Sequence, residues 1–371
     1  MLTVNAGSSS LQLHLVREGR VLRKEHRERR PEIEAVQQTI RAFLDDAGIT
    51  VGAVGHRLVH GGPAVRQPTV VCEEVLAGVR EHADLAPLHV PPALALVEAA
   101  RRSLPEVPHV LCPDTAFHAG LPEEAFTYAV PASWRERFGL RRYGFHGLSY
   151  AWALPRAASL LGRAPSDLHV VLAHLGGGSS VCAVREGVSV DTSMGFTPLE
   201  GLPMSTRSGS VDPGMLMWLL SDGRLSLDQL RQGLERESGL LGLSGGLSGD
   251  TRDLVKSAAP EAALALEVFA HRTAREIAAA TASLDRLDAV VFTGEIGWDQ
   301  PEVRAGVCAR LRTLGVRPPV VTEAEQDRLI SAPDAAVAVL TVQPREELQL
   351  ALTTLKALEA SDGVSRASAS R

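Results

Sequence analysis

The residue with the clearest capacity for chemistry stands at the head of a small-residue turn near the N-terminus. Asn5 is the only asparagine among the 371 residues, and it opens the run Asn-Ala-Gly-Ser-Ser-Ser over residues 5–10. Apolar residues precede this run and an alternating apolar–polar stretch follows it, which predicts a hairpin of two strands. Glycine and serine let an anion approach the main chain, so the turn suits a phosphate group. The alternative role for Asn5 is an Asx turn that caps the loop.

A second glycine-rich turn repeats this pattern in the middle of the chain. Residues 174–181 read His-Leu-Gly-Gly-Gly-Ser-Ser-Val and follow an apolar strand at residues 170–173. Both copies then end in Val-Arg-Glu-Gly, at residues 16–19 and 184–187. An internal duplication with a phosphate-type turn in each half predicts two similar domains that face a shared cleft. Chance similarity between two small-residue turns is the alternative.

Other polar residues stand at predicted strand ends or glycine turns, where open α/β sheets bind ligands. Arg57 precedes His-Gly-Gly, Asp114 closes an apolar strand, His146 lies between aromatic residues and glycines, and Arg207 opens Arg-Ser-Gly. Each alone is compatible with a structural ion pair or a buried histidine. Together they supply glycine loops, separated arginines, a carboxylate and histidines, which phosphoryl transfer to an anionic acceptor requires.

Composition bounds the class of protein. A chain of 371 residues exceeds the size at which one hydrophobic core keeps growing, so two domains are expected. The formal net charge of −6 argues against a dedicated nucleic-acid binder. We expect no secretory signal and no membrane span, because the chain begins with a strand and has no long apolar run. The four cysteines are scattered, and we interpret them as small buried hydrophobes in a reducing cytoplasm.

Strand-like segments alternate with helix-like segments, which predicts mixed α/β layers. Buried strands are expected at residues 110–112 and 289–292, and helices at residues 32–47, 91–104, 215–220, 225–237 and 262–284. From Ser361 onward the chain is rich in Ser, Ala, Gly and Arg, so we expect a frayed end.

Six of these motifs, in this order, resemble those of the acetokinase family of acetate and propionate kinases. They are residues 5–10, 55–62, 86–89, 114–118, 142–147 and 191–201, and the last of these is the long run Asp-Thr-Ser-Met-Gly-Phe-Thr-Pro-Leu-Glu-Gly. The resemblance extends from residue 1 to about residue 355. It implies an α/β fold of duplicated ribonuclease-H-like (actin-like ATPase) domains flanking a central cleft. The expected boundaries are residues 1–118 with 348–371 for the first domain, and residues 119–347 for the second.

The resemblance also implies an activity: transfer of a phosphoryl group from ATP to acetate, with propionate tolerated, giving acetyl phosphate with Mg²⁺ (or Mn²⁺) as cofactor. A cytoplasmic homodimer with no nucleic-acid or membrane partner is implied as well. The implied catalytic residues are Asp114, His146 and Arg207, and the implied metal ligands are Asn5 and Glu346. The implied acyl-site residues are Arg57, Val59, Leu88, Phe145 and Pro198. The implied donor-site residues are Gln12, His174, Leu175, Gly176, Gly177, Gly178, Asp250, Thr251, Arg252, Glu295, Ile296, Gly297, Trp298 and Asp299.

Departures from the family pattern gather at the donor end. The family's lysine after the first turn is Gln12 here, and the asparagine of its second glycine turn is Gly177. In its adenosine loop, a glycine that approaches the nucleotide is replaced by Glu295. Two interpretations therefore stay open: Glu295 points away and ATP binds, or Glu295 fills the pocket and the donor is pyrophosphate or another nucleotide. A non-catalytic ligand-binding member of the family is a third.

Overall fold

The computed structural model describes residues 1–6, 10–28, 33–87, 89–320 and 325–369. The chain divides into two compact units. The first unit comprises residues 1–119, 145–148 and 345–371, and the second comprises residues 120–144 and 149–344.

The first unit is built on one six-stranded mixed sheet with the order β3-β2-β1-β4-β6-β5. The strands are β1 (Leu2–Ala6), β2 (Leu11–Arg17), β3 (Arg20–Arg27), β4 (Val54–Leu58), β5 (Thr69–Val70) and β6 (His109–Pro113). Strands β1, β4 and β6 are parallel neighbours, and the others pair antiparallel. Parallel strands end at the same edge of a sheet, so the residues that follow them can share a site.

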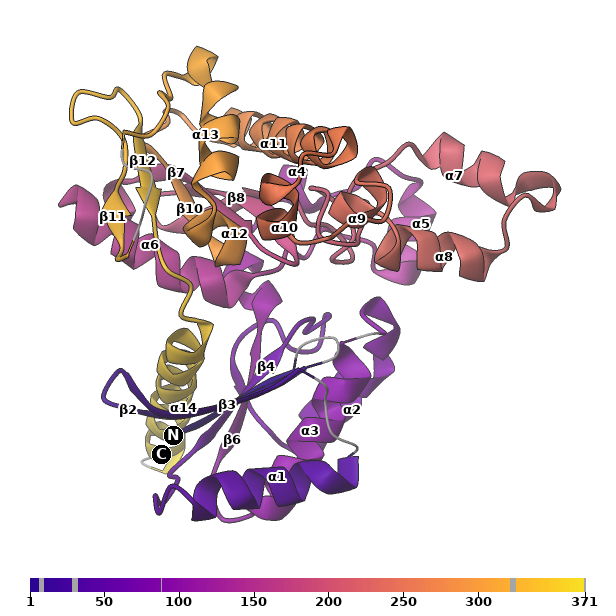
Figure 1. Cartoon of the computed structure of the whole chain (residues 1–371). Helices are drawn as coiled ribbons and strands as arrows, with labels where there is room; N and C mark the ends of the chain where they lie inside the picture. The colour runs from indigo at the N-terminus through magenta and orange to yellow at the C-terminus, as the bar shows by residue number, and fades with distance from the viewer. Residues whose placement is uncertain (7–9, 29–32, 88, 321–324, 370–371) are drawn as a thin grey trace. The chain divides into compact units, whose positions relative to one another are not determined.

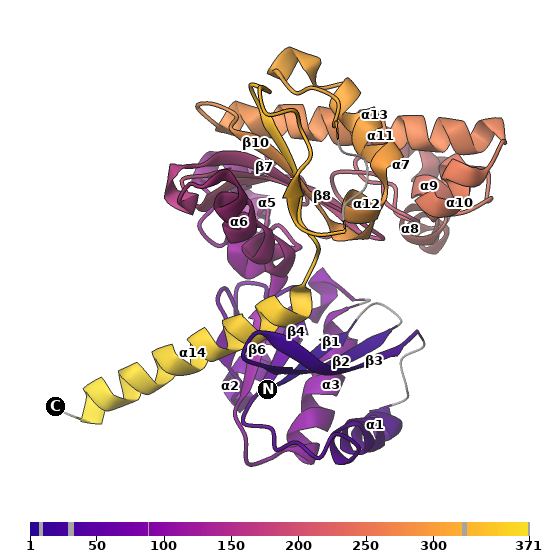
Figure 2. The same cartoon turned by 60° about the vertical axis from the view of Figure 1, so that its left-hand side comes forward.

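Helices cover both faces of this sheet (Figures 1 and 2). Helices α1 (Ile33–Asp45), α2 (Glu73–Glu81) and α3 (Val90–Ser103) lie on one face, where Leu111 of β6 joins the main core. The long helix α14 (Glu346–Ala369) lies on the other, where Val110 and Cys112 contact Leu350. This approach is close, because a methyl group at Gly55 would overlap the hydroxyl of Thr354. The alternation along β6 therefore supplies one residue set to each helical layer.

The second unit repeats this sheet, with the order β9-β8-β7-β10-β12-β11. The strands are β7 (His169–Leu175), β8 (Ser179–Arg185), β9 (Val188–Thr192), β10 (Ala289–Thr293), β11 (Arg328–Leu329) and β12 (Ala338–Thr341). Helices α11 (Pro260–Ala280) and α13 (Pro301–Ala309) pack on one face, around Phe269 and Phe292. Strands β7 and β10 are buried along their whole length, as expected of central strands covered on both faces.

The remaining helices of the second unit are mostly short. They are α4 (Glu123–Phe126), α5 (Ala132–Phe138), α7 (Pro213–Leu220), α8 (Leu227–Arg236), α9 (Gly239–Leu243), α10 (Thr251–Lys256) and α12 (Gly294–Asp299). Helix α6 (Gly147–Leu161) starts at the boundary between the units.

The internal duplication predicted from the two turns is confirmed by strand pairing. In each unit an antiparallel three-stranded meander is followed by two parallel strands and one antiparallel edge strand. The register irregularity also recurs at the same place, between Leu15 and Val16 and between Ala183 and Val184. Both Glu-Gly turns that follow have positive φ at both residues, 50° and 70° in the first and 53° and 84° in the second. Paired positive φ values are typical of a tight hairpin turn.

Two expectations from the sequence are corrected. The segment from Ser361 was expected to fray, but its backbone continues α14 to Ala369, because a helix already anchored by packed turns extends at little cost through Ser, Ala and Arg. Cys72 is exposed at the start of α2, whereas Cys112, Cys182 and Cys308 are buried as expected. Across the described part of the chain, no helix has both the length and the apolar composition needed to cross a bilayer.

Candidate active site

Four predicted residues of the first unit meet around the guanidinium of Arg57. Asn5 lies in β1, Arg57 in β4, Asp114 directly follows β6, and Glu346 opens α14. Arg57 Nη2 donates to Asp114 Oδ2 at 2.7 Å, and its Nε lies 3.2 Å from both oxygens of that carboxylate. Its Nη1 donates to Asn5 Oδ1 at 3.2 Å and lies 3.3 Å from Glu346 Oε2. Every nitrogen of the guanidinium is therefore engaged.

The charges in this cluster are unequal in number and in burial, since Arg57 and Glu346 are partly exposed and Asp114 is not. Asp114 is only 1% exposed, so its carboxylate depends on Arg57 for compensation. Burial favours loss of the arginine proton, but the carboxylates of Asp114 and Glu346 outweigh it and raise the pKa of Arg57. One cation faces two carboxylates, which leaves the cluster able to accept additional positive charge.

The segment that carries His146 packs against the turn of Asp114. His146 has φ 58°, a left-handed conformation that costs a non-glycine residue about 1 kcal/mol or more. A methyl group at Gly147 would overlap the backbone carbonyl of Asp114. The buried ring of His118 contacts the carbonyl of Phe145 at 3.0 Å, and burial lowers the pKa of His118 to about 4, so it is a neutral donor there. His146 is thus held in a strained conformation beside the Asp114 turn.

The predicted acyl-site residues divide between the two units. Val59 and Phe145 are buried in the first unit, where the ring of His60 packs edge-to-face on Phe145 with centroids 5.3 Å apart. Pro198 belongs to the second unit. Leu88 lies outside the described residues, as do Gly7, Ser8 and Ser9 of the first glycine turn.

In the second unit, the repeated glycine turn borders a cavity of about 590 Å³. His174 and Leu175 end β7, and the backbone N–H of Gly176 donates to Ser179 Oγ at 3.3 Å, which closes the turn. The cavity is lined by Gly177, Ser205, Gly249, Asp250, Thr251, Arg252, Glu295, Ile296, Trp298, Asp299, Gln300, Gln343 and Pro344. It therefore lies among the turn, helix α10 and helix α12.

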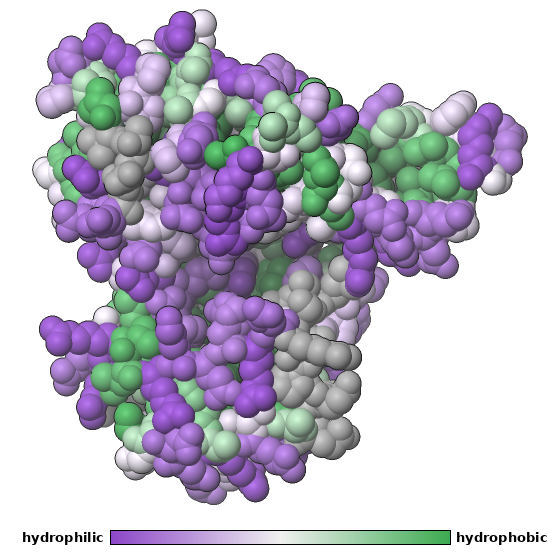
Figure 3. Space-filling view, viewed as in Figure 1, coloured by the Kyte–Doolittle hydropathy of each residue, from purple (hydrophilic) through white to green (hydrophobic). Residues whose placement is uncertain are grey.

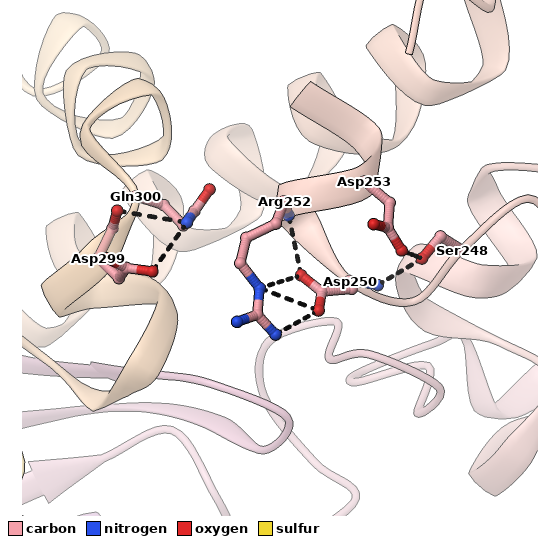
Figure 4. Close-up of polar contacts among 6 residues, drawn as sticks. All are labelled: Ser248, Asp250, Arg252, Asp253, Asp299 and Gln300. Carbon is pink, nitrogen blue, oxygen red and sulfur yellow. Dashed lines mark hydrogen bonds and ion pairs between the residues drawn. The ribbon is translucent and has the colours of Figure 1, made fainter. Parts of the chain in front are cut away.

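The two helices that border the cavity bring charged side chains to it (Figure 4). Asp250 caps α10 and accepts from Arg252, with a shortest distance of 2.6 Å. These hydrogen bonds lower the pKa of Asp250 and raise that of Arg252. Glu295 and Asp299 add further carboxylates, and Glu295 is exposed in the first turn of α12. The predicted adenosine loop is thus a short helix, and Glu295 lines the cavity without filling it.

Arg207 differs from Arg57 in the charge of the groups around its guanidinium. Its Nη1 donates to the carbonyl of Pro198 at 3.0 Å, and among the described residues it forms no ion pair. Burial lowers the pKa of Arg207, and the more distant charge of Glu235 only partly opposes this. A half-buried guanidinium without a carboxylate partner is well suited to an anionic ligand.

The predicted donor-site residues differ in whether they line this cavity. Eight of them line the cavity: Gly177, Asp250, Thr251, Arg252, Glu295, Ile296, Trp298 and Asp299. His174 and Leu175 end β7, Gly176 and Gly178 lie in the adjoining turn, and Gly297 is buried in α12. Gln12 instead belongs to the first unit, as the register partner of Asn5.

Sequence reasoning missed several residues at these sites. Gln343 and Pro344 line the cavity just after β12, so the strand-end rule could have found them. Gln300 follows directly after the predicted segment. Tyr128 was also missed; it contacts Glu200 of the 191–201 motif across 72 residues of sequence, and no local pattern predicts such a pair.

Comparisons of the sequence with known proteins find one family. A model of the acetokinase family matches residues 17–352. Acetate kinase of Deinococcus deserti is 45% identical over 335 residues, which is 88% of this chain and 84% of the relative. Acetate kinase of Deinococcus radiodurans is 47% identical over 311 residues, 82% of this chain and 78% of the relative.

Solved structures agree over almost the whole chain. The acetate kinase of Porphyromonas gingivalis has a TM-score of 0.86 at 33% identity, covering 96% of this chain and 99% of its own. A propionate kinase of Francisella tularensis has a TM-score of 0.88 at 30% identity, covering 96% and 98%.

The Arg57 cluster leads to a prediction about stability. Arg57→Ala removes the cation that pairs with the buried carboxylate of Asp114, so we expect a loss of about 3–5 kcal/mol in the free energy of unfolding. Adding Asp114→Asn to that variant should recover part of the loss, because the buried charge is removed. Urea denaturation measures both. The control is Arg80→Ala, which breaks an exposed pair with Glu98 and should cost at most about 1 kcal/mol; equal losses for Arg57→Ala and Arg80→Ala would contradict the prediction.

Proposed function

The chain belongs to the acetokinase family, and we propose that it transfers the γ-phosphoryl group of ATP to the carboxylate of acetate. A carboxylate oxygen attacks the γ-phosphorus, the bond to the β–γ bridging oxygen breaks, and ADP leaves with that electron pair. The products are acetyl phosphate and ADP. The reaction is reversible, and propionate is tolerated because one methylene contributes only about 1–3 kcal/mol of discrimination in an apolar site.

The observation that carries this proposal is that the second unit holds both an arginine without a carboxylate partner in the described residues and a cavity beside a glycine turn. Arg207 has no ion pair among the described residues, and the same unit has the cavity at the Gly177 turn. Backbone N–H groups of a glycine turn suit phosphate oxygens, and an arginine fork suits either phosphoryl or carboxylate oxygens. A carboxylate needs no strong general base, so catalysis rests on positioning and charge neutralisation.

In the first unit we assign the acceptor and metal functions. Arg57 holds the acetate carboxylate, Asp114 orients the acceptor, and His146 stabilises the charge that develops on the transferring group. Val59 and Phe145 supply apolar contacts to the acyl chain, together with Leu88. Asn5 and Glu346 are the residues that would hold Mg²⁺ (or Mn²⁺), since an amide and a carboxylate oxygen converge on one cationic nitrogen of Arg57. When bound, the ion supplies positive charge to the phosphate oxygens.

ATP is the donor that the structure supports best. Glu295 lines the cavity but leaves about 590 Å³ beside it, so the site is not closed to a nucleotide. Drug-sized ligands occupy cavities of about 300–1,000 Å³. Relatives named acetate kinase do not favour pyrophosphate as donor or a non-catalytic role. We place the enzyme in the cytoplasm, where ATP is available.

We also propose a homodimer, formed through an apolar patch on α7 and α8. The patch consists of Met215, Met217, Trp218, Leu220 and Leu227, all exposed. Figure 3 shows apolar residues gathered over α7. Contiguous apolar surface of this kind marks interaction sites on proteins that are otherwise polar outside.

The proposed role of Arg207 predicts a large kinetic effect. Arg207→Ala should lower turnover with acetate and ATP by about 10³-fold or more, as for other residues that neutralise a transferring phosphoryl group. A coupled assay for ADP with Mg²⁺ measures this, with the wild-type protein as the test of the proposed activity. Arg231→Ala removes an exposed arginine of the same unit and should leave turnover unchanged. Near-normal turnover in Arg207→Ala would remove the assignment.

Glu295 provides a test of the donor site. Glu295→Gly should lower the KM for ATP about fivefold, because repulsion between this solvent-exposed carboxylate and a phosphate charge costs ~1 kcal/mol at a separation of about 4 Å in water. Glu295→Gln separates charge from size, and Glu302→Gln on α13 is the control, since Glu302 does not line the cavity. An unchanged KM in both Glu295 variants would show that this side chain does not contact the nucleotide.

The apolar patch predicts an effect on assembly. Met217→Glu should weaken the dimer by about tenfold or more, because burying a new charge at the interface is unfavourable. Sedimentation velocity over a range of concentrations measures the change. Leu264 is also an exposed apolar residue, on α11, and Leu264→Glu should leave the dimer intact. A dimer unaffected by Met217→Glu would place the interface elsewhere.

A further inference from the structure

The loop formed by residues 193–201 carries the partner of Arg207 but has no regular structure. It follows β9 and contains no helix or strand. Its Pro198 carbonyl accepts from Arg207 Nη1 at 3.0 Å. A loop without a ladder or a helical hydrogen-bond pattern must have its polar backbone groups satisfied in some other way.

Tyr128 satisfies one of these groups from outside the loop. Its hydroxyl accepts from the backbone N–H of Phe196 at 2.8 Å. The same hydroxyl donates to Glu200 Oε2 at 2.5 Å. One side chain therefore ties the middle of the loop to its end.

Arg142 completes the arrangement from a second segment. Its Nη2 donates to Glu200 Oε1 at 2.8 Å, and its Nη1 donates to the carbonyl of Ser193 at 3.1 Å. Its guanidinium carbon also lies 5.5 Å from the centre of the Tyr128 ring. Burial favours loss of its proton, but the carboxylate of Glu200 prevails and raises the pKa of Arg142. Both ends of the loop are thus fixed to one cation.

Gly195 shows how tightly the loop follows these side chains. A methyl group there would overlap both the carboxylate of Glu200 and the hydroxyl of Tyr128. The carbonyl of Gly195 also accepts from the backbone N–H of Tyr143 at 3.0 Å. The backbone at this point therefore requires the absence of a side chain.

We propose that Tyr128, Arg142 and Glu200 are positioning residues that fix the 193–201 loop, and through the Pro198 carbonyl the guanidinium of Arg207. The inference rests on the role of Arg207 in the proposed function. A guanidinium aimed by a single carbonyl follows any displacement of that carbonyl, and a displacement of 1 Å at a reacting centre costs about 10²-fold in rate.

The test is Tyr128→Phe, which removes the hydroxyl and keeps the ring. We expect kcat/KM for acetate to fall about 10-fold or more, while the KM for ATP stays within about twofold, because the hydroxyl does not line the donor cavity. Gly195→Ala should give the same pattern by displacing the loop. An unaltered kcat/KM for acetate in Tyr128→Phe would overturn the proposal.

A double-mutant cycle shows whether the effect passes through Arg207. In an Arg207→Lys background, Tyr128→Phe should cause less than about a twofold further loss, because residues that act as a unit are not additive. Losses that multiply would overturn the proposal. The wild-type protein in the same assay reports on the proposed function itself, so a failure of that function is seen separately, as absent wild-type turnover.

Tyr150→Phe is the matched control for general destabilisation. Tyr150 is buried in the same unit, and its hydroxyl lies 2.5 Å from Ser180 Oγ in β8. We expect a lower Tm with unchanged acetate kinetics well below that Tm. If Tyr150→Phe and Tyr128→Phe lower acetate kcat/KM equally, loss of any buried hydroxyl suffices and the proposal is wrong.

Discussion

The first unit depends on compensation of the buried carboxylate of Asp114 by Arg57. The interaction joins β4 to the end of β6, and the remaining Arg57 nitrogen reaches Asn5 in β1 and Glu346 at the start of α14. One guanidinium thus links three parallel strands near their ends to the C-terminal helix. Because a buried carboxylate is unfavourable without its cation, this pair favours the arrangement in which these elements meet.

The pairing of Arg57 with Asp114 also makes the two arginines of the site differ in their capacity to bind an anion. Arg57 is already balanced by carboxylates, so an anionic substrate must compete with Glu346 and Asn5 for its Nη1. Arg207 has no such competitor among the described residues, and its partner is a neutral carbonyl. Under the proposed function, Arg207 is therefore the stronger anion receptor before any substrate binds, and Arg57 gains capacity when a cation engages the oxygens beside it.

The duplication and several site residues could be predicted from the sequence, because turns and strand ends are visible in the pattern of neighbouring residues. The two Val-Arg-Glu-Gly segments indicated the duplication. A tight hairpin turn needs residues that tolerate positive φ, so the same turn sequence recurs when a structural unit recurs. Arg57 and Asp114 were found because strand ends are visible in hydrophobic pattern. The contact between Tyr128 and Glu200 was not predicted, although Glu200 belongs to the 191–201 motif, since the contact depends on the tertiary path of a loop. The helical conformation at Glu295 was missed because residues 294–299 are too short to show a helical period.

The two arginines show why the surroundings of some site residues could be predicted from the sequence and those of others could not. Arg57 lies within a strand, so the ladder to β1 and β6 fixes its backbone, and the pattern that creates the strand also places the side chain. Arg207 lies in no helix or strand; its carbonyl accepts from Met204, and its neighbour Ser208 donates to Leu234 at the end of α8. Within the described part of the chain, the Pro198 carbonyl is the one hydrogen-bond partner of its guanidinium, and that carbonyl lies in a loop fixed by side chains. Local sequence therefore predicts both the presence and the placement of a residue held in a sheet. For Arg207 the motif identified the residue, but the braced loop that positions it required the folded chain.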